Sequence, residues 1–454
     1  MKSWQSACGE GDNFCVATTV ELGVVCFCSS QLTKLTLKQV INNISSVSLD
    51  FLSHYRTVAA RKALFLACLM SFLCSQKSHK KDDMKHIREL QLLLSEYFNL
   101  SGHNLECLSF FVIGMFMVQT VNLAKLSKTF STATKSESNY KRLQRFIRRL
   151  KFSDDALFLM ISKVFNLTGP LTLCLDRTNW KFGKTHINYL VVSIAYKGIA
   201  IPFIWSLLPD KKRGSSDFND RRNLFDRLLK FIDPTEIKVL LGDREFLSGD
   251  WAAYLKSKGI DFIMRAKENI TTYHKGKTRS FNQVFSNLPT RKALHLKKRC
   301  VVGCDLYVSA KKLKSGELLI LASNRKFADV FDQYRIRWEI ETLFSAVKKR
   351  GFDLEATHLT DPQRLSNLFF VVSIAFVWAY RQGDFVVKNK PIKLKNHGYP
   401  QHSIVRHGLD VVTKAISEIV CNSRKIIASI RLVFKLNISK NTTAKLLGNE
   451  SKIS

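Results

Sequence analysis

The sequence is short of acidic residues. Its 454 residues include 71 Lys and Arg but only 37 Asp and Glu, which gives a formal net charge of +34. A surplus of this size favours a polyanionic partner, most simply nucleic acid, with a membrane surface as the weaker alternative. Because 46% of the residues are hydrophobic and 11% are aromatic, the chain can still bury a large core. We therefore exclude a disordered tail and expect two or three domains.

Long hydrophobic runs are also lacking. The longest runs, at 63–74, 108–118 and 368–380, fall short of the roughly 18 residues that a membrane-spanning helix needs. We interpret them as core helices and expect no membrane partner. The chain does not open on a charged, then apolar, then small-residue cleavage pattern, so secretion is not indicated. The expected location is the cytoplasm.

Cysteine pairs of the kind that bind zinc are absent. No CxxC occurs among the 11 cysteines, and Cys300 and Cys304 have no second pair or His cluster near them. Buried free thiols are the prediction. The cysteines are concentrated in the first 74 residues, within a segment, 1–83, that lacks the basic bias found later. We treat 1–83 as an atypical N-terminal segment that need not be part of the functional protein.

Helical periodicity begins at Met84 and predicts a helical DNA-binding domain over 84–165. The helix predicted over 137–152 has apolar residues on one face and cations on the other, at about 100° per residue. Its cationic face is formed by Lys141, Arg142, Arg145, Arg148 and Arg149. Together with a helix over 123–130, it fits a helix-turn-helix-like DNA reader. A bundle helix with a solvated basic face fits the same pattern equally well.

The pattern changes to short β-rich runs after Gly169. Three adjacent strands are followed by alternating helices and strands, which indicates an α/β fold with a mixed sheet covered by helices. The strands are predicted at 171–176, 188–196, 199–208, 237–243 and 261–267, and the helices at 217–233 and 250–259. Residues 266–325 interrupt this order as a β insertion. Between Lys267 and Lys314 the insertion is strongly basic, so we expect it to face phosphate.

Two aspartates follow apolar strands of this region. Asp176 ends the first strand, and Asp243 ends the strand "IKVLLGD". Either residue alone is more simply interpreted as a turn or cap residue. Two such carboxylates on neighbouring strands of one sheet can, however, converge on a metal ion.

The stretch "YRIRWEIETLFSAVKK", 334–349, predicts a helix with a polar stripe beside its apolar face. Tyr334, Arg337, Glu341 and Lys348 share an arc of about 60°, whereas Glu339 lies on another side. The stripe of these four residues borders the core, as a site must, so Glu341 is the candidate rather than Glu339. A solvated helix face with incidental spacing is the alternative.

Three carboxylates suit metal-dependent phosphodiester chemistry. Mg²⁺ prefers hard oxygen ligands, and three carboxylates can hold two such ions about 4 Å apart, with Mn²⁺ able to substitute. One ion would activate the attacking oxygen and the other would stabilise the leaving oxygen. Cations such as Arg337 and Lys348, with the Tyr334 hydroxyl, would hold the flanking phosphates in register.

The spacing Y-x2-R-x3-E-x6-K resembles the signature of DDE transposases of the insertion-sequence four family. This sequence matches it at Tyr334, Arg337, Glu341 and Lys348, and "LDRTNW" and "GDREF" are similar to the two Asp regions of that family. The resemblance covers about 84–415, where "HGYPQHSIVRHGLD" is similar to a weaker C-terminal segment. It is carried by four fixed positions in one motif and by two Asp motifs in the right order.

The resemblance implies an RNase H-like catalytic domain over 166–360, interrupted by the β insertion. It is flanked by the N-terminal helical DNA-binding region and by a helical C-terminal region, 361–454, that could serve dimerisation. Asp176, Asp243 and Glu341 would be the catalytic metal ligands, and Tyr334, Arg337 and Lys348 would contact DNA. The implied partners are double-stranded DNA, as terminal inverted repeats and target, and a second copy of the chain in a homodimer. A nucleoid-associated protein is expected.

Two departures from the family stand out. Some relatives stack a flipped base on a tryptophan of the insertion, but 266–325 contains none, so Tyr273, Phe281 or Tyr307 would take that role or it would be absent. The C-terminal segment is His-rich where relatives are more basic. We predict a Mg²⁺-dependent cut-and-paste DNA transposase. The alternatives are an RNase H-like nuclease without joining activity and a non-catalytic DNA-binding protein or repressor derived from an inactive transposase.

Overall fold

The chain divides into two compact units, Met1–Lys80 and Lys81–Ser454. The first unit contains an antiparallel pair of strands, β1 (Cys15–Val20) and β2 (Gly23–Cys28). The division lies close to the predicted boundary after residue 83, although the role of that segment stays a prediction. The computed structural model describes residues 15–20, 23–28, 85–130, 134–208, 216–396, 398 and 400–434.

The second unit begins with helices that pack against one another. They are α4 (Lys85–Ser95), α5 (Gly102–Val118), α6 (Leu123–Leu126), α7 (Ser136–Arg149) and α8 (Asp154–Phe165). Of the apolar runs predicted as core helices, 108–118 forms part of α5, which is buried along most of its length, and 63–74 lies outside the described residues. The helix expected over 123–130 ends at Leu126. The first of the two helices needed for a helix-turn-helix is therefore one turn long, and α7 fits the bundle-helix alternative better.

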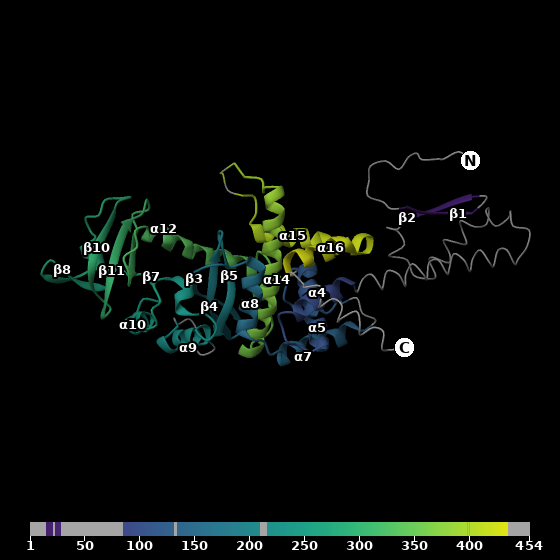
Figure 1. Cartoon of the computed structure of the whole chain (residues 1–454), viewed down its shortest axis with the longest axis horizontal. Coiled ribbons are helices and arrows are strands. Elements are labelled where there is room, and N and C mark those ends of the chain that lie inside the picture. The colour runs from purple at the N-terminus through teal and green to yellow at the C-terminus, as the bar shows by residue number, and fades with distance from the viewer. Residues whose placement is uncertain are drawn as a thin grey trace, which may run out of the picture. The chain divides into compact units, whose positions relative to one another are not determined.

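A large mixed sheet forms the centre of this unit, as the sequence predicts (Figure 1). Its strand order is β10-β11-β12-β7-β6-β3-β4-β5. β3, β4 and β5 form an antiparallel meander, while β6 and β7 run parallel to β3. These five strands are β3 (Leu171–Phe182), β4 (Thr185–Tyr196), β5 (Ile199–Leu207), β6 (Ile237–Gly242) and β7 (Phe262–Arg265).

The β insertion extends this sheet. β12 pairs antiparallel with β7, and β11 and β10 follow in order, so that β10 is the outermost strand. A separate small sheet is formed by two short strands of the insertion. The elements are β8 (Thr271–His274), β9 (Lys277–Ser280), α11 (Phe281–Val284), β10 (Ala293–Val301), β11 (Cys304–Lys312) and β12 (Leu318–Ser323).

Helices and short 3₁₀ turns connect and cover the strands. The helix predicted over 334–349 consists of three pieces, α12, η2 and α13. Before them lie α9, η1 and α10, and η3 follows. Their bounds are α9 (Phe218–Leu228), η1 (Pro234–Glu236), α10 (Gly249–Ser257), α12 (Val330–Arg335), η2 (Ile336–Trp338), α13 (Glu339–Val347) and η3 (Leu354–Ala356).

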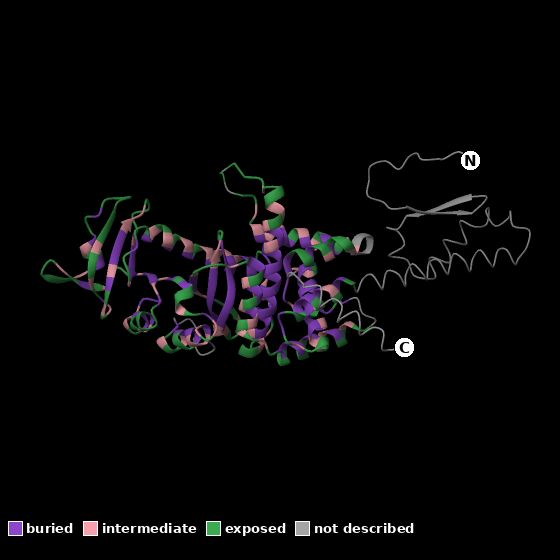
Figure 2. Ribbon diagram, viewed as in Figure 1, coloured by how far each residue is buried: buried purple, intermediate pink, exposed green. Residues whose placement is uncertain are grey.

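The core is centred on the sheet and on α14 (Pro362–Asn389), which packs against β5 and α7 (Figure 2). By length and composition α14 could cross a membrane, but 72% of its most apolar window is buried inside the structure, as in a core helix. Buried Asn367 donates hydrogen bonds to the carbonyl oxygens of Ile147 (2.7 Å) and Leu150 (3.0 Å), which satisfies the C-terminal end of α7. Two further helices follow, α15 (Ile404–Ser417) and α16 (Ile419–Phe434).

The cysteines whose side chains the structure describes are free thiols, and only some of them are buried. Cys107 and Cys174 are buried, Cys304 is partly buried and Cys300 is exposed. The prediction of buried free thiols is therefore wrong for Cys300, which lies on the outermost strand β10. The N-terminal cysteines lie outside the residues whose side chains are described.

Candidate active site

The two aspartates lie side by side on neighbouring parallel strands. Leu175 of β3 is paired with Gly242 of β6, so the next residues on the two chains are Asp176 and Asp243. Both aspartates were expected at strand ends. That is correct for Asp243, but β3 continues through Asp176 as far as Phe182, paired with β4 alone. Asp176 thus projects from the middle of a strand and is held more firmly than a turn residue.

Asp176 is a largely buried carboxylate with two donors. Its side chain is 16% exposed; Oδ1 accepts from the Arg177 backbone N–H at 2.7 Å, and Oδ2 accepts from Arg337 Nη1 at 3.0 Å. Burial raises the pKa of Asp176 to about 7, Arg337 and the backbone N–H work against this rise, and Glu341 and Asp243 add to it. Glu341 and Asp243 are therefore both close enough to Asp176 to affect its pKa.

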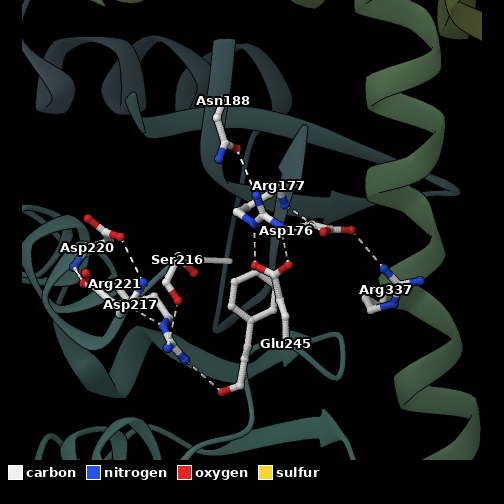
Figure 3. A network of polar contacts seen from close by, with 10 residues as sticks. Asp176, Arg177, Asn188, Ser216, Asp217, Asp220, Arg221, Glu245 and Arg337 are labelled. Carbon is white, nitrogen blue, oxygen red and sulfur yellow. Dashed lines mark hydrogen bonds and ion pairs between the residues drawn. The ribbon is translucent and has the colours of Figure 1, made fainter. Parts of the chain in front are cut away.

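Arg337 links the carboxylate of β3 to the carboxylate of α13. Figure 3 shows its contact with Asp176. It lies in η2, and its Nη1 is 3.0 Å from Asp176 Oδ2 and 3.7 Å from Glu341 Oε1. Burial lowers the pKa of Arg337, but Tyr334 and the carboxylates outweigh this effect and raise the pKa above its usual value. Glu341 is 44% exposed and faces the open side of the site. The guanidinium of Arg337 thus lies between the carboxylates of Asp176 and Glu341.

The chemistry of this donor set fits a hard divalent cation, because its predicted members are carboxylate oxygens. Among the residues that the structure describes, no three His, Cys, Asp or Glu side chains are grouped closely enough to hold an ion directly. The Arg337 guanidinium pairs with two of the three predicted ligands instead. The assignment of Asp176, Asp243 and Glu341 as metal ligands stays a prediction.

Tyr334 and Lys348 lie on opposite sides of Arg337 and Glu341 along the helix. The Tyr334 hydroxyl is buried without a hydrogen-bond partner among the described residues, and burial raises its pKa. Lys348 Nζ donates to the Asn179 carbonyl oxygen at 3.1 Å and pairs with Glu355 at 3.1 Å. Between Glu341 and Lys348 lies an open groove of about 400 Å³, lined by Arg177, Thr178, Asn179, Glu341, Phe344, Ser345 and Lys348.

Glu339 points to a different part of the molecule, as the helical wheel predicts. Its carboxylate accepts hydrogen bonds from the backbone N–H groups of Tyr196 (2.8 Å) and Gly198 (2.9 Å), in the turn between β4 and β5. Burial raises the pKa of Glu339, and these two bonds oppose the rise. The solvated-face alternative is therefore wrong for this residue, which fixes a turn.

An ion pair that was not predicted from the sequence joins residues that closely follow the two aspartates in the chain. Arg177 Nε and Nη2 donate to the two oxygens of Glu245 at 2.6 and 2.8 Å, and Arg177 Nη1 donates to Asn188 Oδ1 at 3.2 Å (Figure 3). A signal was present, because the two Asp motifs carry further charged residues of opposite sign to each other: Arg177 in "LDRTNW" and Glu245 in "GDREF".

The predicted basic surfaces are mostly exposed. On α7, Lys141, Arg145, Arg148 and Arg149 are exposed, whereas Arg142 pairs with Glu106 at 2.7 Å. On the insertion, Tyr273 is 66% exposed, but Phe281 is fully buried. Phe281 cannot stack on a base without unfolding its surroundings, so Tyr273 and the partly buried Tyr307 remain as the aromatic candidates.

Residues 168–378 match the family model for the transposase DDE domain, and this range contains Asp176, Asp243 and Glu341. The match supports a DDE transposase. A DDE transposase of this kind acts as a polynucleotidyl transferase or nuclease on DNA. The chain is also similar to a cryo-EM structure of a piggyBac transposase synaptic complex with hairpin DNA. The match covers 80% of this chain and 82% of the piggyBac chain, at 12% sequence identity and a TM-score of 0.35. That likeness is too weak to establish a shared fold. No curated protein matches the chain.

Proposed function

We propose that the chain is a DNA transposase of the insertion-sequence four family that cuts and joins DNA with Mg²⁺. The observation that carries this proposal is that Arg337 pairs with both Asp176 and Glu341, while Asp243 directly follows the strand that is paired with β3 just before Asp176. All four residues lie inside the range that matches the transposase DDE domain. Mn²⁺ would substitute for Mg²⁺. The order β5-β4-β3-β6-β7, with β3 antiparallel to β4 and parallel to β6, supports an RNase H-like catalytic domain.

The residues divide the work by position and charge. Asp176 and Asp243 would hold the metal from the sheet, and Glu341 would hold it from α13. When bound, Mg²⁺ would activate the attacking oxygen and stabilise the leaving oxygen. Arg337 is within reach of the carboxylates and of a phosphate brought beside them, while the buried Tyr334 hydroxyl offers a neutral donor. Lys348 stands at the far end of the groove and would fix the next phosphate.

The substrate side of the proposal rests on charge. The net charge of +34 and the exposed cations of α7 and of the insertion suit double-stranded DNA, as terminal inverted repeats and as target. By the resemblance to the family, the active form would be a homodimer on paired ends. The protein would act in the cytoplasm, associated with the nucleoid.

The test is an assay for cleavage and joining. Inverted repeats in the DNA that flanks the gene supply the substrate, and the purified chain is incubated with it in Mg²⁺ or in chelator. Metal-dependent cleavage at the repeat ends followed by joining to a second DNA supports the proposal. Cleavage without joining would indicate a nuclease instead. Binding without metal-dependent cleavage would indicate a repressor derived from an inactive transposase.

A further inference from the structure

Asp176 lies on β3 and Asp243 directly follows β6. One ion pair, between Arg177 and Glu245, joins these two segments. Asp176 is followed immediately by Arg177 on β3, and Asp243 is followed two positions later by Glu245, beyond the end of β6. The parallel ladder between the two strands ends at the pair Leu175 and Gly242. Backbone pairing of β3 with β6 therefore stops just before the carboxylates, and beyond that point side chains must set their relative position.

The ion pair between Arg177 and Glu245 supplies this connection. It fixes both the distance between the two side chains and their relative orientation. The two parallel bonds of 2.6 and 2.8 Å make a fork that tolerates little rotation, and the two side chains are 12% and 23% exposed. Asn188 of β4 holds the third guanidinium nitrogen at 3.2 Å. Arg177 is thus fixed to the sheet on one side and to the segment after Asp243 on the other.

The segment after Asp243 is held at its far end as well. The Phe246 N–H donates to the Asp243 carbonyl oxygen at 3.0 Å, which closes a tight turn, and Arg221 of α9 donates to the Phe246 carbonyl oxygen at 3.3 Å. Arg221 is itself buried and is bonded to the carbonyl oxygens of Ser216 and Asp217 (Figure 3). Glu245 is the one carboxylate of this turn that reaches back to β3.

We propose that Arg177 and Glu245 are positioning residues, which set the spacing and orientation of Asp176 and Asp243 for divalent-cation binding. The inference rests on the proposed function, because it assumes that these two aspartates bind the cation. Neither side chain of the pair needs to touch metal or DNA. Groups that orient metal ligands from outside commonly change metal affinity by about 10–100-fold when they are replaced.

The experiment must separate positioning from stability, because removal of one member leaves a buried charge unpaired. Replacing both members by apolar residues of similar size is often neutral or stabilising for a buried ion pair. The first variant is therefore Arg177→Met/Glu245→Met. The second, Arg177→Lys, keeps the charge but loses the planar fork. The matched control is Arg227→Met/Asp154→Met, which removes an ion pair of 2.7 Å between α9 and α8 that has no link to either aspartate.

The full-length chain is titrated with Mn²⁺ alone, free Mn²⁺ is followed by electron paramagnetic resonance, and each variant's thermal unfolding is recorded. Binding at the site is defined as the amount of Mn²⁺ bound by the wild type minus the amount bound by Asp176→Asn. We expect the half-saturating Mn²⁺ concentration to rise about 10–100-fold in both test variants and to stay at the wild-type value in the control. The midpoint of thermal unfolding of the double variant should stay within a few degrees of the wild type.

The outcomes distinguish this inference from the proposed function. If the wild type binds no more Mn²⁺ than Asp176→Asn, the predicted metal site is wrong, and both the proposed function and the positioning role are overturned. If the wild type binds at the site and the two test variants bind equally well, only the positioning role is overturned. Loss of the fold in both test variants would also overturn it, because the pair would then support the whole sheet rather than the two carboxylates.

Discussion

Arg337 is the residue at which the strand and helix parts of the site meet. It stabilises the ionised form of Asp176, whose pKa burial raises to about 7, and it lies 3.7 Å from Glu341. A helical wheel predicts that Arg337 and Glu341 share a face, but it cannot predict a contact with a strand residue 161 positions away. The partners of Glu339 were unpredictable for the same reason, since Tyr196 and Gly198 belong to a distant turn.

We expect His86 to make the stability of the folded chain sensitive to acid. It is 5% exposed in α4, and its Nδ1 has no hydrogen-bond partner among the described residues. Burial lowers its pKa from 6.5 to about 4. Because the folded pKa lies below the unfolded value, the unfolded chain binds more protons between these two pH values. The stability contribution is therefore complete above pH 6.5 and is lost as the pH falls toward 4.

We expect His86→Leu to lose about 3 kcal/mol less free energy of unfolding than the wild type between pH 7 and pH 4. Urea denaturation at the two pH values measures the difference. The control is His103→Leu, at an exposed position, which should lose as much as the wild type. Equal losses in wild type and His86→Leu would show that His86 is not the source of the sensitivity.

At the scale of elements, apolar patterns predicted the strands and core helices well. The polar half of β3 was missed because the apolar run stops at Leu175, while the strand goes on through four consecutive polar residues and is paired there with β4. The helix over 334–349 was predicted as continuous, since it contains neither Gly nor Pro to mark the 3₁₀ turn η2. The four-residue length of α6 was also not visible in its sequence.

The contact between α14 and α15 depends on glycine. A Cβ at Gly408 would collide with the Ala379 carbonyl oxygen and the Gly383 N–H, which are backbone atoms that cannot move aside. We expect Gly408→Ala to lower the free energy of unfolding by about 1–3 kcal/mol or more, because the helices must separate. Gly102→Ala is the matched control, since its Cβ would meet only Gln91 Nε2 at 3.8 Å. Thermal or urea unfolding that affects both variants equally would contradict the close approach.

At the scale of the whole molecule, the mixed sheet and its helical cover were predictable from the order of strand-like and helix-like patterns. The extension of that sheet by the insertion was not, because strand pairing between β12 and β7 leaves no periodic signal in either segment. The assignment of three carboxylates to the site comes from motifs and stays a prediction, whereas the Arg177–Glu245 pair was found only in the structure.

Exposed cations should make DNA binding depend steeply on salt. Each phosphate neutralised releases close to one counterion, so the slope of log affinity against log salt counts phosphate contacts. We expect Arg148→Gln/Arg149→Gln on α7 to reduce this slope by about 2. The control is Arg222→Gln/Lys230→Gln, which removes two exposed cations near α9 and should leave the slope unchanged. An equal change in the two pairs would mean that α7 is an ordinary solvated face.

Residues 1–83 should be dispensable for DNA binding. They differ from the rest in cysteine use and charge, and the compact unit that carries the site begins at Lys81. A chain that starts at Met84 is expected to fold and to bind terminal-repeat DNA with an affinity equal to that of the full chain. Circular dichroism and a binding titration measure these properties. Misfolding or lost binding in the shorter chain alone would refute the prediction.

The two glutamates of α13 test the central claim most directly. Rates of Mg²⁺-dependent nicking are measured on DNA that carries the element's own ends, at a temperature where both variants are folded. Glu341→Gln should lose several orders of magnitude in cleavage while end binding persists, because a charge that holds the metal is removed. Glu339→Gln leaves one turn N–H without an acceptor at a cost of about 1–2 kcal/mol in stability, but cleavage should stay within roughly tenfold of the wild type. Equal loss of cleavage in the two variants, or retained cleavage in Glu341→Gln, would contradict the account.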